Sequence, residues 1–311
     1  MYPRIRTLGG TATLACLLYA ASAATTASAQ DAHQHAAPSS ANPDPNRAVK
    51  SPGNAEWAKT AEEARARAAA ENKLVYYEFD SPNCGDCHRM QSLLYPAFDF
   101  EALLIGMVPV KVRYDFPEAK PLQELYGVAT APSVLITTPE GRLVFLMQGF
   151  KDAPDFYRHA HKDLDLYRQF SKKVEAQDVA TLSANEALAT GRELYARKDP
   201  KAALPRLERA SVAPNPGAGV REAALESLAA VELELADPAA SRRAIDQLIA
   251  TTKNPDQKER AELFAAQIPL AQNKPAEALA LYKKFAADHP NSKYIERVQS
   301  FIARLSSPPT P

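Results

Sequence analysis

Two cysteines, Cys84 and Cys87, are separated by two residues in the stretch SPNCGDCH, and His88 follows at once. A pair with this spacing can form a disulfide and exchange it with another dithiol, because a thiolate attacks a disulfide sulfur. The same five residues, CGDCH, match the attachment pattern of a c-type haem. Cys84, Cys87 and His88 together could also hold Cu(I), which prefers soft ligands. The stretch therefore allows redox exchange, haem attachment or copper binding.

The elements on either side of the pair favour redox exchange. The run KLVYYEF before it indicates a strand, and HRMQSLLYPAF after it has helical spacing. Cys84 would then open a helix, where free N–H groups and the positive end of the dipole favour a thiolate. Cys87, one turn further on, would resolve a mixed disulfide. Asp86 disfavours the thiolate, while a protonated His88 would favour it. We expect a reducing couple.

The N-terminus predicts export. Arg4 and Arg6 precede an apolar run, and the triplet ASA ends at Ala29. This is the layout of a secretory signal with a small-residue cleavage site. We therefore expect residues 1–29 to be a signal peptide that is cleaved after Ala29, and the mature protein to be periplasmic or secreted.

Removal of the signal peptide would leave two cysteines. Cys16 lies inside the apolar run, and its context, TLAC, is a poor match to a lipoprotein cleavage box, so a lipid anchor there is not expected. An exported chain with only Cys84 and Cys87 does not use disulfides as structural staples. Residues 30–53 are rich in Pro, Ser, Asn and Ala without an apolar period, which predicts a disordered linker.

The composition restricts the possible classes of function only broadly. The chain has 311 residues, enough for about two domains, with 37 basic and 37 acidic residues. This balance gives no support for nucleic-acid binding. Strand and helix patterns alternate from residue 54 to about 172, and only helical patterns follow from 173 to 306. Residues 307–311 form a short tail that we expect to be disordered.

Residues 54–172 predict an α/β domain. A helix with Trp57 on its buried face comes first, followed by the strand KLVYYEF and the cysteine helix. The strand MVPVKVRYD and a short helix ending at Gly127 come next. A hairpin turning at PEG and a closing helix from DAPDFYRH complete the domain.

These residues resemble the thioredoxin superfamily. The strand leads into CxxC as the central strand of that family does, and TAPSV matches its cis-proline loop. The resemblance implies that Pro132 lies beside the dithiol and that Asn83, Thr130 and Ala131 contact substrate. It also implies a buried acid at Glu78, six residues before Cys84, which would carry protons for Cys87.

A lysine on the next strand often accompanies that acid in the family, and the matching residue is Lys111. Glu78 and Lys111 could equally form a structural ion pair. The sequence departs from the family pattern at Asn83, where an aromatic residue is usual, and in its Gly-Asp dipeptide.

The C-terminal part contains a weak repeat. The segments DPKAALPRL, DPAASRRAI and KPAEALALY place a proline where a helix can begin, followed three residues later by a small residue. These prolines are Pro200, Pro238 and Pro275, and the small residues are Ala203, Ser241 and Ala278. The spacing predicts tetratricopeptide-like helix pairs, with an irregular helical bundle as the alternative.

The most consistent function is that of an exported thiol–disulfide oxidoreductase with no cofactor. Its partners would be protein thiols or disulfides, a membrane electron donor or acceptor, and a protein or peptide on the helical repeats. One alternative is an adaptor in which the repeats act and the dithiol is idle or redox-sensitive. The other is a copper or haem carrier, with Met90, Met107 or Met147 as a further haem ligand. A closed zinc site lacks the four ligands it needs.

Overall fold

The computed structural model describes residues 56–96, 98–214, 216–217 and 219–307. The expected signal peptide (1–29), the linker (30–53) and residues 308–311 of the tail lie outside these ranges. The described residues divide into two compact units. One holds residues 56–177 together with Arg197–Asp199, and the other holds the remaining residues from Asp178 onward.

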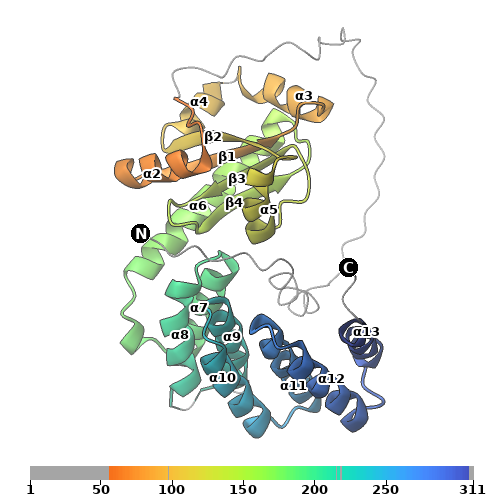
Figure 1. Cartoon of the computed structure of the whole chain (residues 1–311). Coiled ribbons are helices and arrows are strands. Elements are labelled where there is room, and N and C mark those ends of the chain that lie inside the picture. Colours follow the sequence, from red (N-terminus) through yellow and green to blue (C-terminus); the bar gives the residue numbers. More distant parts are fainter. Residues whose placement is uncertain (1–55, 97, 215, 218, 308–311) are drawn as a thin grey trace, which may run out of the picture. The chain divides into compact units, whose positions relative to one another are not determined.

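The first unit is a mixed α/β domain (Figure 1). Its helices and strands follow the predicted order, with one additional helix before the second strand. They are α2 (Ala61–Glu71), β1 (Leu74–Asp80), α3 (Gly85–Leu94), α4 (Phe98–Leu104), β2 (Met107–Arg113), η2 (Pro117–Ala119), α5 (Lys120–Tyr126), β3 (Ser133–Thr137), β4 (Leu143–Gln148) and α6 (Ala153–Glu175).

The four strands form one sheet in the order β2-β1-β3-β4. β1 runs parallel to β2, while β3 is antiparallel to both β1 and β4. The β3–β4 hairpin turns at Gly141 as predicted, with φ of +101°, a backbone conformation that glycine adopts without strain. β1, which leads to the cysteines, therefore lies at the centre of the sheet.

The two faces of the sheet are covered by different helices. Val75, Tyr77 and Phe79 alternate along β1 and join a core cluster with residues of α2 and α5. Tyr76 and Glu78 point to the opposite face, since successive side chains on a strand alternate. Tyr76 there contacts the ring of Phe100 on α4 at 5.8 Å between centroids. The face of the sheet beneath α3 thus carries one acid among aromatic rings.

The structure of this unit differs from the sequence-based expectations at two places. Trp57 does not lie on the first helix, because α2 begins at Ala61, where the hydroxyl of Thr60 accepts a hydrogen bond from the backbone N–H of Glu63. Ala58 pairs with Val110 as an isolated parallel bridge. Helix α4 was not predicted, because HRMQSLLYPAF was interpreted as one helical stretch. In the structure α3 ends at Leu94, and the seven-residue α4 begins at Phe98, after Pro96.

The second unit consists of helices packed in sequence order (Figure 1). Sequence neighbours lie against each other all along it. Its elements are η3 (Val179–Thr181), α7 (Ala184–Ala196), α8 (Pro200–Val212), α9 (Val220–Glu234), α10 (Pro238–Thr251), α11 (Pro255–Ala271), α12 (Pro275–Asp288) and α13 (Ile295–Ser306). The chain thus has a mixed α/β unit followed by an all-α unit, in the predicted order.

The repeat seen in the sequence corresponds to equivalent positions in this helical unit. The three prolines named above are the first residues of α8, α10 and α12. The three small residues that follow them are each 0% exposed. At Ser241 the side-chain hydroxyl donates to the carbonyl oxygen of Ala229 on α9, at 2.8 Å. Small side chains thus allow consecutive helices to approach closely, as predicted. The tetratricopeptide-like classification itself stays a prediction.

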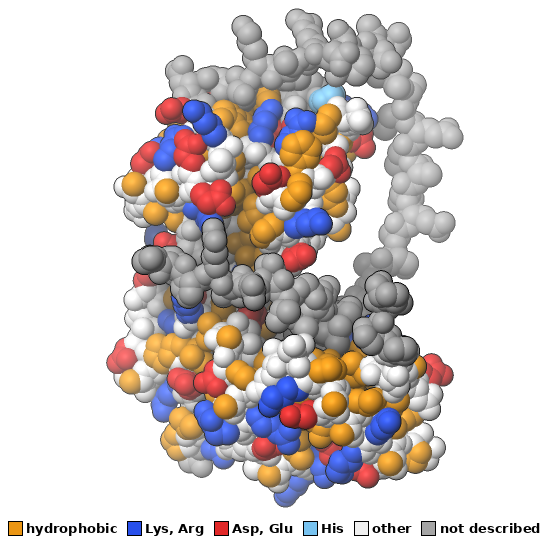
Figure 2. Space-filling view, in the orientation of Figure 1, with side chains coloured by type: hydrophobic (Ala, Val, Ile, Leu, Met, Phe, Trp, Pro, Cys, Tyr) orange, Lys and Arg blue, Asp and Glu red, His pale blue; other side chains and the backbone are white. Residues whose placement is uncertain are grey.

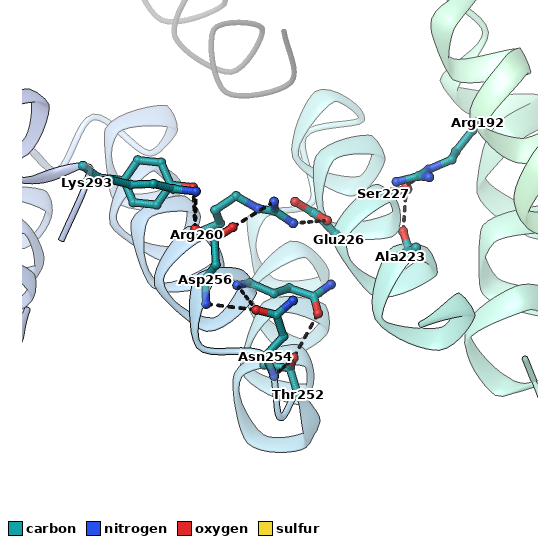
Figure 3. A network of polar contacts seen from close by, with 11 residues as sticks. Arg192, Ala223, Glu226, Ser227, Thr252, Asn254, Asp256, Arg260 and Lys293 are labelled. Atoms are coloured by element: carbon teal, nitrogen blue, oxygen red, sulfur yellow. Dashed lines mark hydrogen bonds and ion pairs between the residues drawn. The ribbon is translucent and has the colours of Figure 1, made fainter. Parts of the chain in front are cut away.

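Polar contacts connect the alternate helices α7, α9 and α11 (Figure 3). Arg192 on α7 donates to the hydroxyl of Ser227 on α9 at 3.0 Å. Arg260 on α11 lies 3.5 Å from carboxylate oxygens of both Glu226 and Asp256. These contacts link one helix pair to the next through side chains as well as through the apolar core.

Charges of both signs are interspersed with apolar side chains on the face of the helical unit shown in Figure 2. This mixture is usual for a solvated protein surface. Among the residues that the structure describes, no helix is both long enough and apolar enough to cross a membrane.

Candidate functional site

Cys84 and Cys87 lie where the central strand passes into a helix. β1 ends at Asp80, and Cys84 is the N-cap of α3, as the sequence predicted. The two sulfurs form a disulfide of 2.03 Å. The backbone N–H of Cys87 donates to the Sγ of Cys84 at 3.0 Å. When the bond is reduced, the same N–H and the helix dipole are placed to stabilise a thiolate on Cys84.

The two cysteines differ in access. Cys87 is 1% exposed, whereas Cys84 is partly exposed. A substrate sulfur can approach Cys84 directly but not Cys87. This asymmetry suits the predicted roles, in which Cys84 attacks first and Cys87 attacks Cys84 afterwards.

The proline loop lies at the same end of the sheet as the disulfide. The strand register pairs Phe79 near the end of β1 with Ser133 at the start of β3. Pro132, directly before Ser133, is buried, and its bond to Ala131 is cis. The carbonyl oxygen of Pro132 accepts a hydrogen bond from the N–H of Gly149 at 2.8 Å.

The three predicted substrate contacts border this end of the sheet. Asn83 and Thr130 are exposed, and Ala131 is partly exposed. The hydroxyl of Ser133 donates to the carbonyl oxygen of Thr130 at 2.7 Å, which holds the loop in place. Their role in substrate binding stays a prediction.

Glu78 is an acid enclosed beneath α3. It is 2% exposed, and its carboxylate accepts hydrogen bonds from the Tyr95 hydroxyl at 2.8 and 2.7 Å. The side-chain amide of Gln91 on α3 also donates to it. Burial raises the pKa of the Glu78 carboxyl, while the charge of Lys111 and the bonds from Tyr95 and Gln91 oppose this rise. Such an acid is able to exchange a proton at a pH above its ordinary range.

Lys111 lies opposite Glu78 in the strand register, as the resemblance implied. The two side chains do not form a direct ion pair within 4.0 Å in the described structure. The Nζ of Lys111 instead lies 5.5 Å from the ring centroid of Trp57 and 5.3 Å from that of Tyr95. A cation over aromatic faces is stabilised without a carboxylate contact. Lys111 therefore influences Glu78 through space rather than by direct pairing.

Sequence reasoning missed Tyr95 and Gln91. Gln91 lies four residues after Cys87, so it shares the buried face of α3, and this spacing was the one available signal. Tyr95 is the C-cap of that helix and reaches Glu78 from 17 positions away in the sequence. No fixed offset in the sequence connects a strand acid to a residue at the far end of the next helix.

The raised pKa of Glu78 predicts a pH-dependent gain in stability for Glu78→Gln. A carboxyl with a higher pKa in the folded than in the unfolded state binds its proton more tightly when folded. Its ionisation therefore opposes folding, and stability falls as pH rises from the unfolded pKa, about 4.3, through the folded pKa. Glutamine does not ionise, so the variant should exceed the wild type most at high pH.

Urea unfolding of the oxidised proteins at pH 5 and pH 8, followed by the fluorescence of Trp57, measures this difference. Trp57 is the single tryptophan of the chain and lies in the unit that contains Glu78. The gain in the free energy of unfolding should be larger at pH 8. An equal difference at the two pH values would contradict the ionisation argument.

The methionines named in the haem alternative are core residues. Met90, Met107 and Met147 are 1%, 6% and 7% exposed, respectively. Within the described ranges, no group of three or more His, Cys, Asp or Glu side chains is arranged to hold a metal ion.

Comparisons with known proteins identify the first unit. Residues 61–162, about a third of the chain, match the model of a thioredoxin-like domain family. Comparison with curated protein sequences gave no match. Together with the sheet, the CxxC disulfide and the proline loop, the family match shows that this unit has a thioredoxin-like fold.

Three solved structures are similar to part of the chain. A thioredoxin from Thermus thermophilus is 23% identical, with a TM-score of 0.32, over 35% of this chain and 86% of that protein. The oxidoreductase DsbH is 19% identical, with a TM-score of 0.31, over 41% of this chain and 96% of its own. The C-terminal domain of Neisseria meningitidis DsbD, in its oxidised form, is 21% identical, with a TM-score of 0.28, over 34% and 99%.

Proposed function

Because residues 61–162 form a thioredoxin-like domain, we propose that the protein is an exported thiol–disulfide oxidoreductase that acts on protein substrates. One observation carries the proposal, namely the disulfide at the start of α3 with Cys84 accessible and Cys87 enclosed. A structural staple would not need one sulfur at a helix N-terminus and open to solvent.

In the reducing direction, the Cys84 thiolate attacks one sulfur of a substrate disulfide. The substrate S–S bond breaks, a Cys84–substrate disulfide forms, and the other substrate sulfur leaves as a thiolate that takes a proton from water. Cys87 then loses its proton and attacks Sγ of Cys84. The second substrate sulfur leaves, and two electrons have passed from the protein dithiol to the substrate.

Glu78 is the proposed acceptor of the Cys87 proton. It is buried under the same helix, and a carboxylate with a raised pKa is a stronger base than one in water. Pro132 has no N–H, so the loop before β3 leaves room beside Cys84 for an extended substrate flanked by Asn83, Thr130 and Ala131.

We propose export on the basis of residues 1–29, with cleavage after Ala29 and a periplasmic or secreted location. The working direction would be reduction, because Asp86 in the first turn of α3 disfavours a thiolate on Cys84. In an oxidising compartment the Cys84–Cys87 disulfide must be reduced again after each reaction, so a membrane electron donor is a further proposed partner. The helical unit would bind a protein or peptide partner.

The experiment that tests this function is a redox equilibrium. The mature protein is equilibrated in dithiol buffers of defined potential, and free thiols are counted by alkylation and mass spectrometry. A potential at or below about −250 mV is expected for a reductant. A potential near about −120 mV would reverse the direction to oxidation. Copurified haem or copper on a pair that does not exchange with the buffer would overturn the proposal.

A further inference from the structure

Tyr95 contacts two charged groups beneath helix α3, the carboxylate of Glu78 and the ammonium of Lys111. Its hydroxyl donates to the carboxylate of Glu78, and its ring faces the ammonium of Lys111 at 5.3 Å. The side chain is fixed by further ring contacts, with Phe100 at 5.1 Å and with Trp57 at 6.2 Å between centroids. Tyr95 itself is 5% exposed. It therefore has little freedom to move away from the acid.

We propose that Tyr95 is a positioning residue that sets the proton affinity of Glu78 and, through it, the pH at which Cys87 becomes nucleophilic. The inference rests on the proposed function for its catalytic part. Its electrostatic part concerns Glu78 alone and can be measured without any substrate.

The hydrogen-bond geometry supports a direct effect on the acid. The Tyr95 hydroxyl lies within hydrogen-bond distance of both carboxylate oxygens, so it can stabilise the negative charge whichever oxygen carries it. Burial of Tyr95 and the adjacent Glu78 charge both raise the pKa of the phenol, which therefore stays protonated and remains a donor. The phenol therefore remains the donor while Glu78 gains or loses its proton.

Other groups facing Glu78 also act on its charge, but among the described residues only Tyr95 donates to both carboxylate oxygens. Lys111 on β2 favours the ionised acid without a direct ion pair, and Asp80 on β1 disfavours it. Gln91 on α3 supplies the second hydrogen bond. Of these groups, Gln91 lies one turn beyond Cys87 on the same buried helix face. A change in the position of the Glu78 carboxylate would therefore affect Gln91 and the helix face that carries the Cys87 thiol.

Tyr76 provides a matched control within the same cluster. It is 0% exposed and lies two residues before Glu78 on the same face of β1. Its hydroxyl has no hydrogen-bond partner among the described residues. Tyr76→Phe and Tyr95→Phe both remove one phenol oxygen from one aromatic cluster, but only the second removes a bond to the acid.

The test begins with a direct titration of Glu78. The ¹³C chemical shift of its carboxyl is followed against pH in the oxidised protein, with Glu78→Gln used to assign the signal. In Tyr95→Phe the pKa of Glu78 should be higher by about one to two units, as expected for the loss of a hydrogen bond to a charged acceptor. In Tyr76→Phe it should stay within a few tenths of the wild-type value.

The second readout is the pH profile of disulfide reduction with a model peptide disulfide. The pH at which the reduction rate reaches half its maximum should be higher in Tyr95→Phe, in parallel with the pKa of Glu78. In Tyr76→Phe this pH should not change. Gln91→Leu, which removes the other donor, should move it in the same direction. An unchanged Glu78 pKa in Tyr95→Phe would overturn the inference.

The outcomes separate this inference from the proposed function. A wild-type protein that reduces the peptide, with one pH profile shared by all variants, retains the function and refutes the role of Tyr95 in catalysis. A wild-type protein that does not reduce the peptide refutes the function, while the carboxyl titration still decides whether Tyr95 controls Glu78.

Discussion

Cys84→Ser is expected to abolish disulfide exchange, and Cys87→Ser is expected to trap the protein in a covalent complex with its substrate. Removing the accessible sulfur removes the nucleophile, so the rate should fall by a factor on the order of 10³ or more. Removing the enclosed sulfur leaves the first attack intact, because Cys84 keeps its position at the N-terminus of α3. The mixed disulfide then has no internal thiol to resolve it.

Mass spectrometry under non-reducing conditions measures both results. Each variant is first reduced and freed of reductant, then mixed with a peptide disulfide. Cys87→Ser should gain the mass of one peptide thiol, and added dithiol should release it. Cys84→Ser should gain little, since Cys87 is 1% exposed. Ser92→Ala, an exposed change on the same helix, is the control and should behave as the wild type.

The pattern of adducts also distinguishes the alternatives for the protein. A stronger adduct on Cys84→Ser than on Cys87→Ser would reverse the roles given to the two sulfurs. In an adaptor with an idle dithiol, neither variant would alter binding to a cellular partner, and the helical unit would account for the whole activity. If the protein is a redox enzyme, Cys84→Ser should instead abolish its cellular effect.

Much of the active-site scaffold could be predicted because its signals are local. A strand followed by CxxC and a helical pattern places Cys84 at a helix N-terminus within a dozen residues. Gly141 occupies a turn whose backbone favours glycine, so the hairpin was evident as well. The proline that opens each of α8, α10 and α12 marked helix starts in the same way.

The contacts beneath the active-site helix could not be predicted, because they depend on packing between distant segments. Trp57 was assigned to a helix from its Ala- and Glu-rich neighbours, but it lies before α2 and contacts Tyr76 and Tyr95. A structural ion pair between Glu78 and Lys111 was one of two alternatives, and the strand register does place the two residues opposite each other. The rings of Trp57 and Tyr95, which lie beside the Lys111 ammonium instead, come from outside the two strands.

Tyr282→Ala is expected to destabilise the helical unit by about 3–5 kcal/mol, the range for truncating a large buried aromatic residue. Tyr282 on α12 is 0% exposed, and its ring stacks on Phe301 of α13 with centroids 5.2 Å apart. It belongs to a core cluster that also includes Leu263 of α11 and Val298 of α13. One truncation would therefore open a cavity among three helices.

Tyr282→Phe separates the loss of volume from the loss of the hydroxyl. The Tyr282 hydroxyl is buried without a hydrogen-bond partner among the described residues, and burial raises the pKa of this phenol to about 12. Removing an unpaired buried polar atom relieves its desolvation cost, so this variant should be as stable as the wild type or more so. Urea unfolding followed by circular dichroism at 222 nm reports the helices, while Trp57 fluorescence reports the thioredoxin-like unit separately. Equal destabilisation by Phe and Ala would mean that the hydroxyl, and not the ring, holds these three helices together.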